Sequence, residues 1–304
     1  MSAVPWWRGW RAADSGQVEL LDLRQYVEKM ILSYLQVIKL PTKPNMDSLD
    51  RLTAALLGEL REKQAANALT QDDIERWLMR SPLFAAVQTN VFRSAFDLDI
   101  PHDYQHILPA VRGAPADHAS PLGPLEQMFV NHSLPMARRD QWRLLFSTAV
   151  HGQSFSKLVG QITDKGPSLV VVRDTDGHVF GGFAPESWHT SGGFYGTSEA
   201  FLFSVRPKME VFLPSGYNEN YMYLNVNQQT LPNGLGFGGK FEYFGLFISG
   251  DFGEGFTAPT CTTFDLRQMS GRKRFQLDAL EVWAVGPEPK KQEAVGRPAQ
   301  HSGR

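Results

Sequence analysis

A histidine and a serine near the middle of the chain have the types and the spacing of a hydrolytic pair. His151 precedes Ser154 by three residues, and a serine hydroxyl beside an imidazole base is how many hydrolases make a nucleophile. The G-x-S-x-G turn that exposes such a serine is absent, because the local string is Gly-Gln-Ser-Phe-Ser. Ser154 is also placed to cap a helix that begins at Phe155. The sequence therefore favours a capping serine, and a hydrolase that uses Ser154 and His151 is the alternative.

The single cysteine, Cys261, is the other candidate nucleophile. A peroxide-reducing thiol needs a helix N-terminus or cationic neighbours to lower its pKa. The threonine-rich, strand-like segment 259–264 offers neither, so we expect a buried structural cysteine, and a catalytic antioxidant is the alternative. One cysteine also excludes an intramolecular disulfide and a multi-cysteine zinc cluster, and it fits a reducing compartment.

Two motifs have a spacing typical of metal ligands. His102 and His106 are four residues apart, as zinc ligands on one helix face are, but Asp103 stands where the H-E-x-x-H motif has glutamate. The segment Asp174-Thr-Asp176-Gly177 begins like a calcium loop, but its glycine comes at the fourth position instead of the sixth. The sequence therefore predicts no metal and no other cofactor.

A run of glycines follows Asn233 and invites comparison with a phosphate-binding loop. A dinucleotide loop needs G-x-G-x-x-G between a strand and a helix, so that the helix N-terminus meets the phosphates. Here aromatic residues typical of a strand follow the glycines, and no helix is expected. We predict a structural glycine loop, in which side chains would strain the backbone, at Gly234, Gly236, Gly238 and Gly239.

The composition excludes several classes of protein. The 304 residues include 30 basic and 32 acidic side chains, a formal net charge of -2, so there is no basic field for nucleic acid. The longest unbroken apolar run, Leu83–Val87, is far shorter than the ~20 residues that cross a bilayer. The first residues lack the apolar core of a signal peptide, and Ser2 stands where an N-myristoyl signal has glycine. We expect a cytoplasmic protein.

The first third of the chain is predicted to be helical. Segment 18–100 has apolar residues that recur every three or four positions, as in Leu20, Leu23, Val27, Met30 and Tyr34. This pattern predicts about four helices in an EF-hand-like arrangement, and since the calcium-loop motif is missing we expect it to bind no metal. A tail, 1–17, precedes this region, and the proline-rich segment 101–124 is predicted to be a linker.

The rest of the chain has the pattern of short strands. Aromatic and β-branched runs alternate with glycine, proline and asparagine between residues 120 and 286, and Asp176-Gly177 is a strong hairpin signal. One segment, 155–162, reads as a helix. The sequence therefore predicts an α+β protein in which a helical region precedes two packed sheets, followed by a disordered tail at 287–304.

Eight blocks in this half resemble the TLDc domain family, in the family's order. They are Leu144–Ser147, His151–Phe155, Val179–Phe183, Ala200–Phe203, Leu231–Gly239, Tyr243–Phe247, Thr260–Phe264 and Leu280–Val285. The resemblance covers residues 120–286 and implies a two-sheet β-sandwich with flanking helices and no catalytic role. Segments 217–225 and 74–79 most resemble a member tied to lysosomal mTOR signalling.

This resemblance implies partners as well as a fold. It implies an adaptor that binds subunits of the vacuolar-type proton pump, associates with the mTOR signalling complex and supports stress resistance. Association with the lysosomal membrane would be peripheral and through a partner. Because loops between short strands present exposed groups on a rigid scaffold, we expect the contact residues in the loop Tyr217, Asn218, Glu219 and Asn220.

Overall fold

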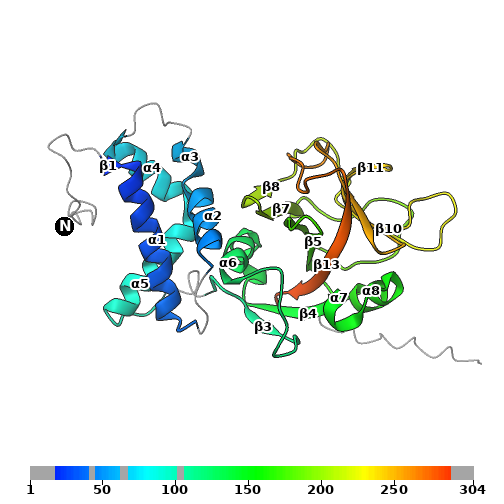
Figure 1. Ribbon diagram of the computed structural model, residues 1–304, viewed down its shortest axis with the longest axis horizontal. Helices are drawn as coiled ribbons and strands as arrows, with labels where there is room; N and C mark the ends of the chain where they lie inside the picture. The colour runs from blue at the N-terminus through cyan, green and yellow to red at the C-terminus, as the bar shows by residue number, and fades with distance from the viewer. Residues whose placement is uncertain (1–17, 41–44, 62–67, 101–105, 289–304) are drawn as a thin grey trace, which may run out of the picture.

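The computed structural model describes residues 18–40, 45–61, 68–100 and 106–288 (Figure 1). The predicted tail 1–17, most of the tail 287–304 and His102 lie outside the described residues. The described part is a mixture of helices and mostly antiparallel strands, which confirms the predicted α+β class. No helix in that part is long and apolar enough to span a membrane.

The region before residue 100 is helical, as its periodicity predicts. A short antiparallel pair, β1 (Val18–Glu19) with β2 (Ala68–Leu69), ties its two halves together. The N-terminus of the fourth helix is held by Thr70 and Asp73, whose side chains cap each other's backbone N–H groups. The helices are α1 (Leu20–Val37), α2 (Met46–Leu56), α3 (Gly58–Arg61), α4 (Gln71–Arg80) and α5 (Pro82–Ala95).

The β-rich half carries most of the strands and four further helical segments. Its strands are β3 (Ala110–Arg112), β4 (Gln141–Ser147), β5 (Ser168–Asp174), β6 (Val179–Ala184), β7 (Phe201–Arg206), β8 (Glu210–Phe212), β9 (Met222–Asn225), β10 (Gly234–Lys240), β11 (Tyr243–Ser249), β12 (Glu254–Thr257) and β13 (Arg274–Val285). The helices are α6 (Pro124–Ser133), α7 (Thr148–His151), α8 (Phe155–Ile162) and the 3-10 turn η4 (Met136–Arg138).

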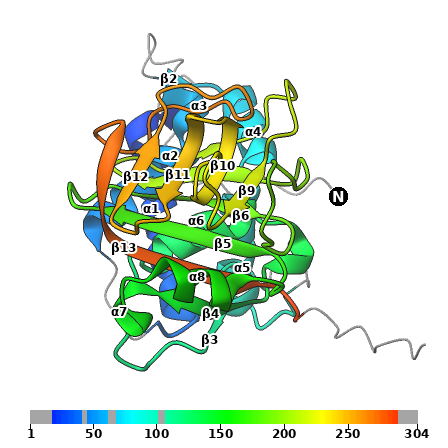
Figure 2. The same ribbon diagram turned by 90° about the vertical axis from the view of Figure 1, so that its right-hand side faces the viewer.

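The two predicted sheets share one long strand, β13. Its first residues pair with β12, the following residues pair with β5, and its last five residues, 281–285, also pair with β4 on the other side. Figure 2 shows β10–β12 running across the direction of β5. The two layers enclose a core in which Phe180 meets Phe275 edge-on, with ring centroids 5.1 Å apart, and Trp188 meets Phe237 at 5.4 Å.

The opposite face of β5 and β13 is covered by the helical region. One continuous hydrophobic cluster joins Trp77 and Phe84 of the helices to Trp142, Val171 and Trp283 of the strands. Helix α6 lies between the two parts, next to α2 (Figure 1). Burial of large aromatic side chains on both faces of the sheet therefore stabilises the packing of the helical region and of the second layer against it.

The described part of the predicted linker, 106–124, is structured. Its strand β3 pairs in parallel with β4 at the sheet edge. Beyond β3, the His118 ring lies 2.7 Å from one oxygen of the buried Glu281 carboxylate, and the Ser120 hydroxyl donates to the other oxygen at 2.6 Å. The prolines that suggested a linker flank an edge strand of three residues, too short for a sequence pattern. This segment is a strap bound to the sheet and not a free tether.

Candidate partner-binding surface

The structure places His151 and Ser154 in separate structural roles. The Nδ1 atom of His151 accepts the backbone N–H of Ser147 at 3.0 Å, and its ring stacks on Phe146. The Ser154 hydroxyl accepts the N–H of Lys157 at 3.4 Å, which confirms that it caps α8. Within the described residues these two side chains form no hydrogen bond with each other, and so no serine–histidine relay is assembled.

The cap gives a direct test of this assignment. Ser154→Ala is expected to lower the free energy of unfolding by about 1 kcal/mol, because the first turn of α8 loses a hydrogen-bond acceptor. Chemical denaturation of both proteins measures this difference. Ser154→Asp, which retains a capping oxygen, is the control and should unfold close to the wild type. Ester hydrolysis by the wild type that disappears in Ser154→Ala would contradict the structural role.

Cys261 is half-buried, whereas the sequence predicted a buried cysteine. Its sulfur packs against the backbone of β10 and β11: a Cβ built at Gly238 would lie 2.8 Å from the Sγ atom, and one at Gly245 would lie 3.1 Å away. The thiol therefore fills the space that two glycines leave. Partial exposure arises because residues 259–262 form a surface loop and not a strand.

The described residues of the two motifs with metal-ligand spacing form contacts with other protein groups. His106 lies 3.5 Å from the carboxylate of Asp140. Asp174, at the β5–β6 hairpin predicted from Asp176-Gly177, accepts hydrogen bonds from the His178 N–H and the Ser270 hydroxyl. Among the residues that the structure describes, no three histidine, cysteine or acidic side chains converge as a metal site would require.

The predicted glycine loop is a strand, β10, and this is a correction. A Cβ at Gly234 would come within 2.4 Å of the Phe247 ring, and one at Gly236 within 2.7 Å of the Phe244 ring. Gly238 and Gly239 have φ values of 69° and 82°, which side chains disfavour. Glycine normally weakens a strand, which is why the segment read as a loop. The alternation of glycine with Leu235 and Phe237 was the signal for a strand with one bare face.

Aromatic rings of neighbouring segments occupy that bare face. Phe244 and Phe247 stack with centroids 4.5 Å apart, and Tyr223 of β9 lies 5.3 Å from Phe244. Phe194 and Phe241 complete the cluster from two loops. Burial raises the pKa of the Tyr223 phenol, whose hydroxyl donates to the carbonyl of Pro232 at 2.7 Å. That phenol is a structural donor and not a base.

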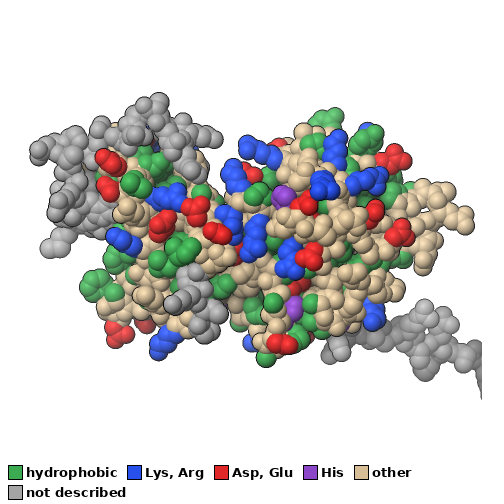
Figure 3. Space-filling model, in the orientation of Figure 1, with side chains coloured by type: hydrophobic (Ala, Val, Ile, Leu, Met, Phe, Trp, Pro, Cys, Tyr) green, Lys and Arg blue, Asp and Glu red, His purple; other side chains and the backbone are tan. Residues whose placement is uncertain are grey.

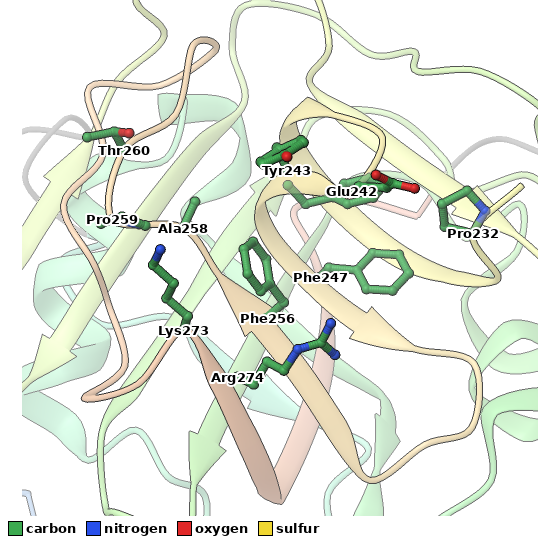
Figure 4. A pocket seen from close by; sticks show the side chains of 11 residues that line it. Pro232, Glu242, Tyr243, Phe247, Phe256, Ala258, Pro259, Thr260, Lys273 and Arg274 are labelled. Atoms are coloured by element: carbon green, nitrogen blue, oxygen red, sulfur yellow. The ribbon is translucent and has the colours of Figure 1, made fainter.

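A groove of about 720 Å³ opens beside this cluster (Figure 4). The strand register sets Phe247 of β11 beside Phe256 of β12, and Phe256 beside Arg274 of β13. In Figure 4 the two rings lie side by side, with the cations on one side of them and the β10–β11 turn on the other. None of these residues was predicted as a site. The groove is lined by Pro232, Glu242, Tyr243, Phe244, Phe247, Phe256, Ala258, Pro259, Thr260, Lys273 and Arg274.

The predicted contact loop 217–220 divides into two kinds of residue. The side chain of Asn218 bonds Thr262 and Thr263, and that of Asn220 donates to the carbonyl of Gly239 at 2.7 Å. These asparagines fix the loop. Tyr217 is 81% exposed and Glu219 is also exposed. The bonds to Thr262 place this loop next to segment 259–262, which begins at the groove.

Comparisons with known proteins show which family the β-rich half of the chain resembles. The model of the TLDc domain matches residues 124–286. The chain is 36% identical to the mTOR-associated protein MEAK7 of Gallus gallus over 308 residues, which cover 93% of this chain and 66% of the relative. It is 51% identical to the human protein of that name over 174 residues, covering 57% and 38%.

A second group of relatives matches the β-rich half. Human oxidation resistance protein 1 is 34% identical over 159 residues, which cover 52% of this chain and 17% of that protein. The chain thus spans between 38% and 66% of the length of the two MEAK7 relatives given above. Because the domain model matches more than half of its residues, the chain belongs to the TLDc domain family.

Proposed function

We propose that this chain is a non-catalytic adaptor that binds subunits of the vacuolar-type proton pump and acts in lysosomal mTOR signalling and in resistance to oxidative stress. Two groups of relatives support the signalling and stress-resistance parts of the proposal. One group is named for association with mTOR and the other for resistance to oxidation. Attachment to the lysosomal membrane would be peripheral, through the pump.

The observation that best supports this function is that Tyr217 and Glu219 are exposed on a loop whose backbone is held by hydrogen bonds. Asn218 and Asn220 hold the loop backbone through three side-chain hydrogen bonds, while the neighbouring tyrosine and glutamate face solvent. An aromatic ring and a charge on a preordered loop lose little conformational entropy when they bind a partner. The half-buried thiol and the capping serine assemble no comparable catalytic arrangement.

Capture of the pump's peripheral sector tests this function. Tyr217→Ala with Glu219→Ala is expected to reduce capture at least about tenfold, because tyrosine at the centre of an interface is often worth 2 kcal/mol or more. Met79→Ala is the matched control: Met79 is also 81% exposed but lies on α4, so its capture should equal that of the wild type.

Equal capture by the double variant would remove the loop from the contact surface. Absence of capture by the wild type, together with peroxide turnover that is lost in Cys261→Ser, would overturn the adaptor function in favour of a catalytic antioxidant. Thermal unfolding of each variant shows that the fold is retained.

A further inference from the structure

The groove beside β12 has a floor of two aromatic rings, with cationic side chains along one side and the β10–β11 turn along the other. Phe247 and Phe256 are neighbours across the strands, and both remain partly exposed. The side of Phe247 that faces β10 meets Gly236, which has no side chain. The floor therefore stays open to solvent, while the same rings would be buried if β10 carried large residues here.

Two cations border one side of this floor. Lys273 and Arg274 are exposed, and neither forms an ion pair with any residue in the described part of the chain. Their neighbour Arg272 differs, because its guanidinium pairs with Asp176 at 3.2 Å. Figure 3 shows lysine and arginine side chains gathered around the N-terminal end of β13. The groove thus has two exposed cations on one side that are free of ion pairs within the described residues and can meet an anionic ligand.

The side of the groove formed by the β10–β11 turn carries one glutamate and one lysine. Glu242 lies at the tip of the β10–β11 hairpin, beside Tyr243, which is 61% exposed (Figure 4). Lys240 lies over the Tyr243 ring, 5.2 Å from its centroid. Glu254 of β12 lies on the cationic side, because the register pairs it with Gln276, two residues after Arg274, and its carboxylate accepts a hydrogen bond from Gln276 at 3.2 Å. At the Lys273–Arg274 side two cations outnumber one carboxylate, whereas Lys240 and Glu242 offset each other at the β10–β11 turn, so an anionic ligand is favoured at the Lys273–Arg274 side.

We propose that this groove binds an acidic segment of a partner protein, in which a large apolar side chain is followed by two or more carboxylates. The apolar side chain packs on Phe247 and Phe256, and the carboxylates face Lys273 and Arg274. The proposal rests on the proposed function only in taking the chain to be a protein-binding module; the groove is a second contact, separate from Tyr217 and Glu219.

A peptide fits these observations better than a phosphate ion or a lipid surface. A small anion would leave the two phenylalanine rings unused. A flat bilayer could not place headgroups at Lys273 and Arg274 without also meeting the glutamate on the other rim. An extended peptide can place one apolar side chain on the floor and carry the residues that follow it toward the cations, because each extended residue advances the chain by about 3.3 Å.

Fluorescence polarisation with the full chain and a labelled peptide, Gly-Phe-Glu-Glu-Gly, tests the proposal. We expect saturable binding that weakens with salt, and a loss of at least about tenfold in affinity in Lys273→Glu with Arg274→Glu. Glu242→Gln should tighten binding. Lys29→Glu with Lys39→Glu, the same change of charge at exposed positions on and just after α1, is the matched control and should leave affinity unchanged. A peptide with lysine in place of its glutamates should not bind.

Three outcomes would overturn the proposal: no saturable binding, equal affinity in the double variant, or binding to phosphatidylserine vesicles that Lys273→Glu with Arg274→Glu abolishes while the peptide fails to bind. Thermal unfolding of each variant separates loss of binding from loss of fold. The titration contains no pump subunit. Its failure therefore leaves the proposed function to be judged by pump capture, and Tyr217→Ala with Glu219→Ala should bind the peptide normally.

Discussion

Gly181→Ala is expected to destabilise the protein by about 4 kcal/mol or more, enough to unfold the β-rich half under ordinary conditions. Gly181 lies in β6 between β5 and β7. A Cβ at this position would lie 1.9 Å from the carbonyl oxygen of Val170 and 2.8 Å from the ring of Phe203. The first obstacle is the backbone of the paired strand, which can move only by breaking the β5–β6 ladder. One methyl group therefore disrupts the middle of the sheet.

Thermal and chemical denaturation measure this effect, and Gly160→Ala is its matched control. Gly160 lies inside α8, where a Cβ would meet nothing within 4 Å. The same chemical change should there stabilise the protein by about 0.5 to 1 kcal/mol, because alanine is the better helix former. If both variants shifted the midpoint in the same direction, the steric explanation would fail.

Arg51→Met is expected to cost about 3 kcal/mol, because it leaves the buried carboxylate of Glu126 without its nearest cation. Glu126, on α6, is 1% exposed. One carboxylate oxygen accepts from the Ser48 hydroxyl at 2.6 Å and from Arg51 at 3.1 Å, with Arg206 at 3.9 Å. The other oxygen is buried with no hydrogen-bond partner.

The double variant Arg51→Met with Glu126→Met decides whether the charge is the cause. It should be more stable than Arg51→Met alone, since an apolar pair replaces a buried unpaired charge. A double-mutant cycle in urea gives the coupling between α2 and α6. Strictly additive effects would show that the Arg51–Glu126 pair itself contributes no coupling between α2 and α6.

Elements with a strong period were predictable from the sequence. The helical spacing from Leu20 onward predicted α1, and the run 155–162 predicted α8 to the residue. Asp176-Gly177 predicted the β5–β6 hairpin because positive φ is cheap for glycine, and Gly177 has a φ of 86°. In each case local physics and tertiary packing favour the same conformation.

The rest depends on contacts between residues far apart in sequence. β10 looked like a loop because its glycines have a purpose only when Phe244 and Phe247 are known to lie against them. The strap 106–124 depends on Glu281, which comes more than 150 residues later. The groove exists because the register aligns Phe256 with Arg274. No local pattern encodes such pairings.

The position of β13 has a consequence for how the protein is made. This strand is the link between the two layers, yet it is the last element that the structure describes, at Arg274–Val285. During synthesis β4 and β5 must wait for it, because each pairs with residues added more than 100 positions later. Unpaired strand edges are prone to aggregation, and such distant pairings fold slowly. A nascent chain in which β13 is still inside the ribosome is therefore expected to expose the unpaired edges of β4 and β5.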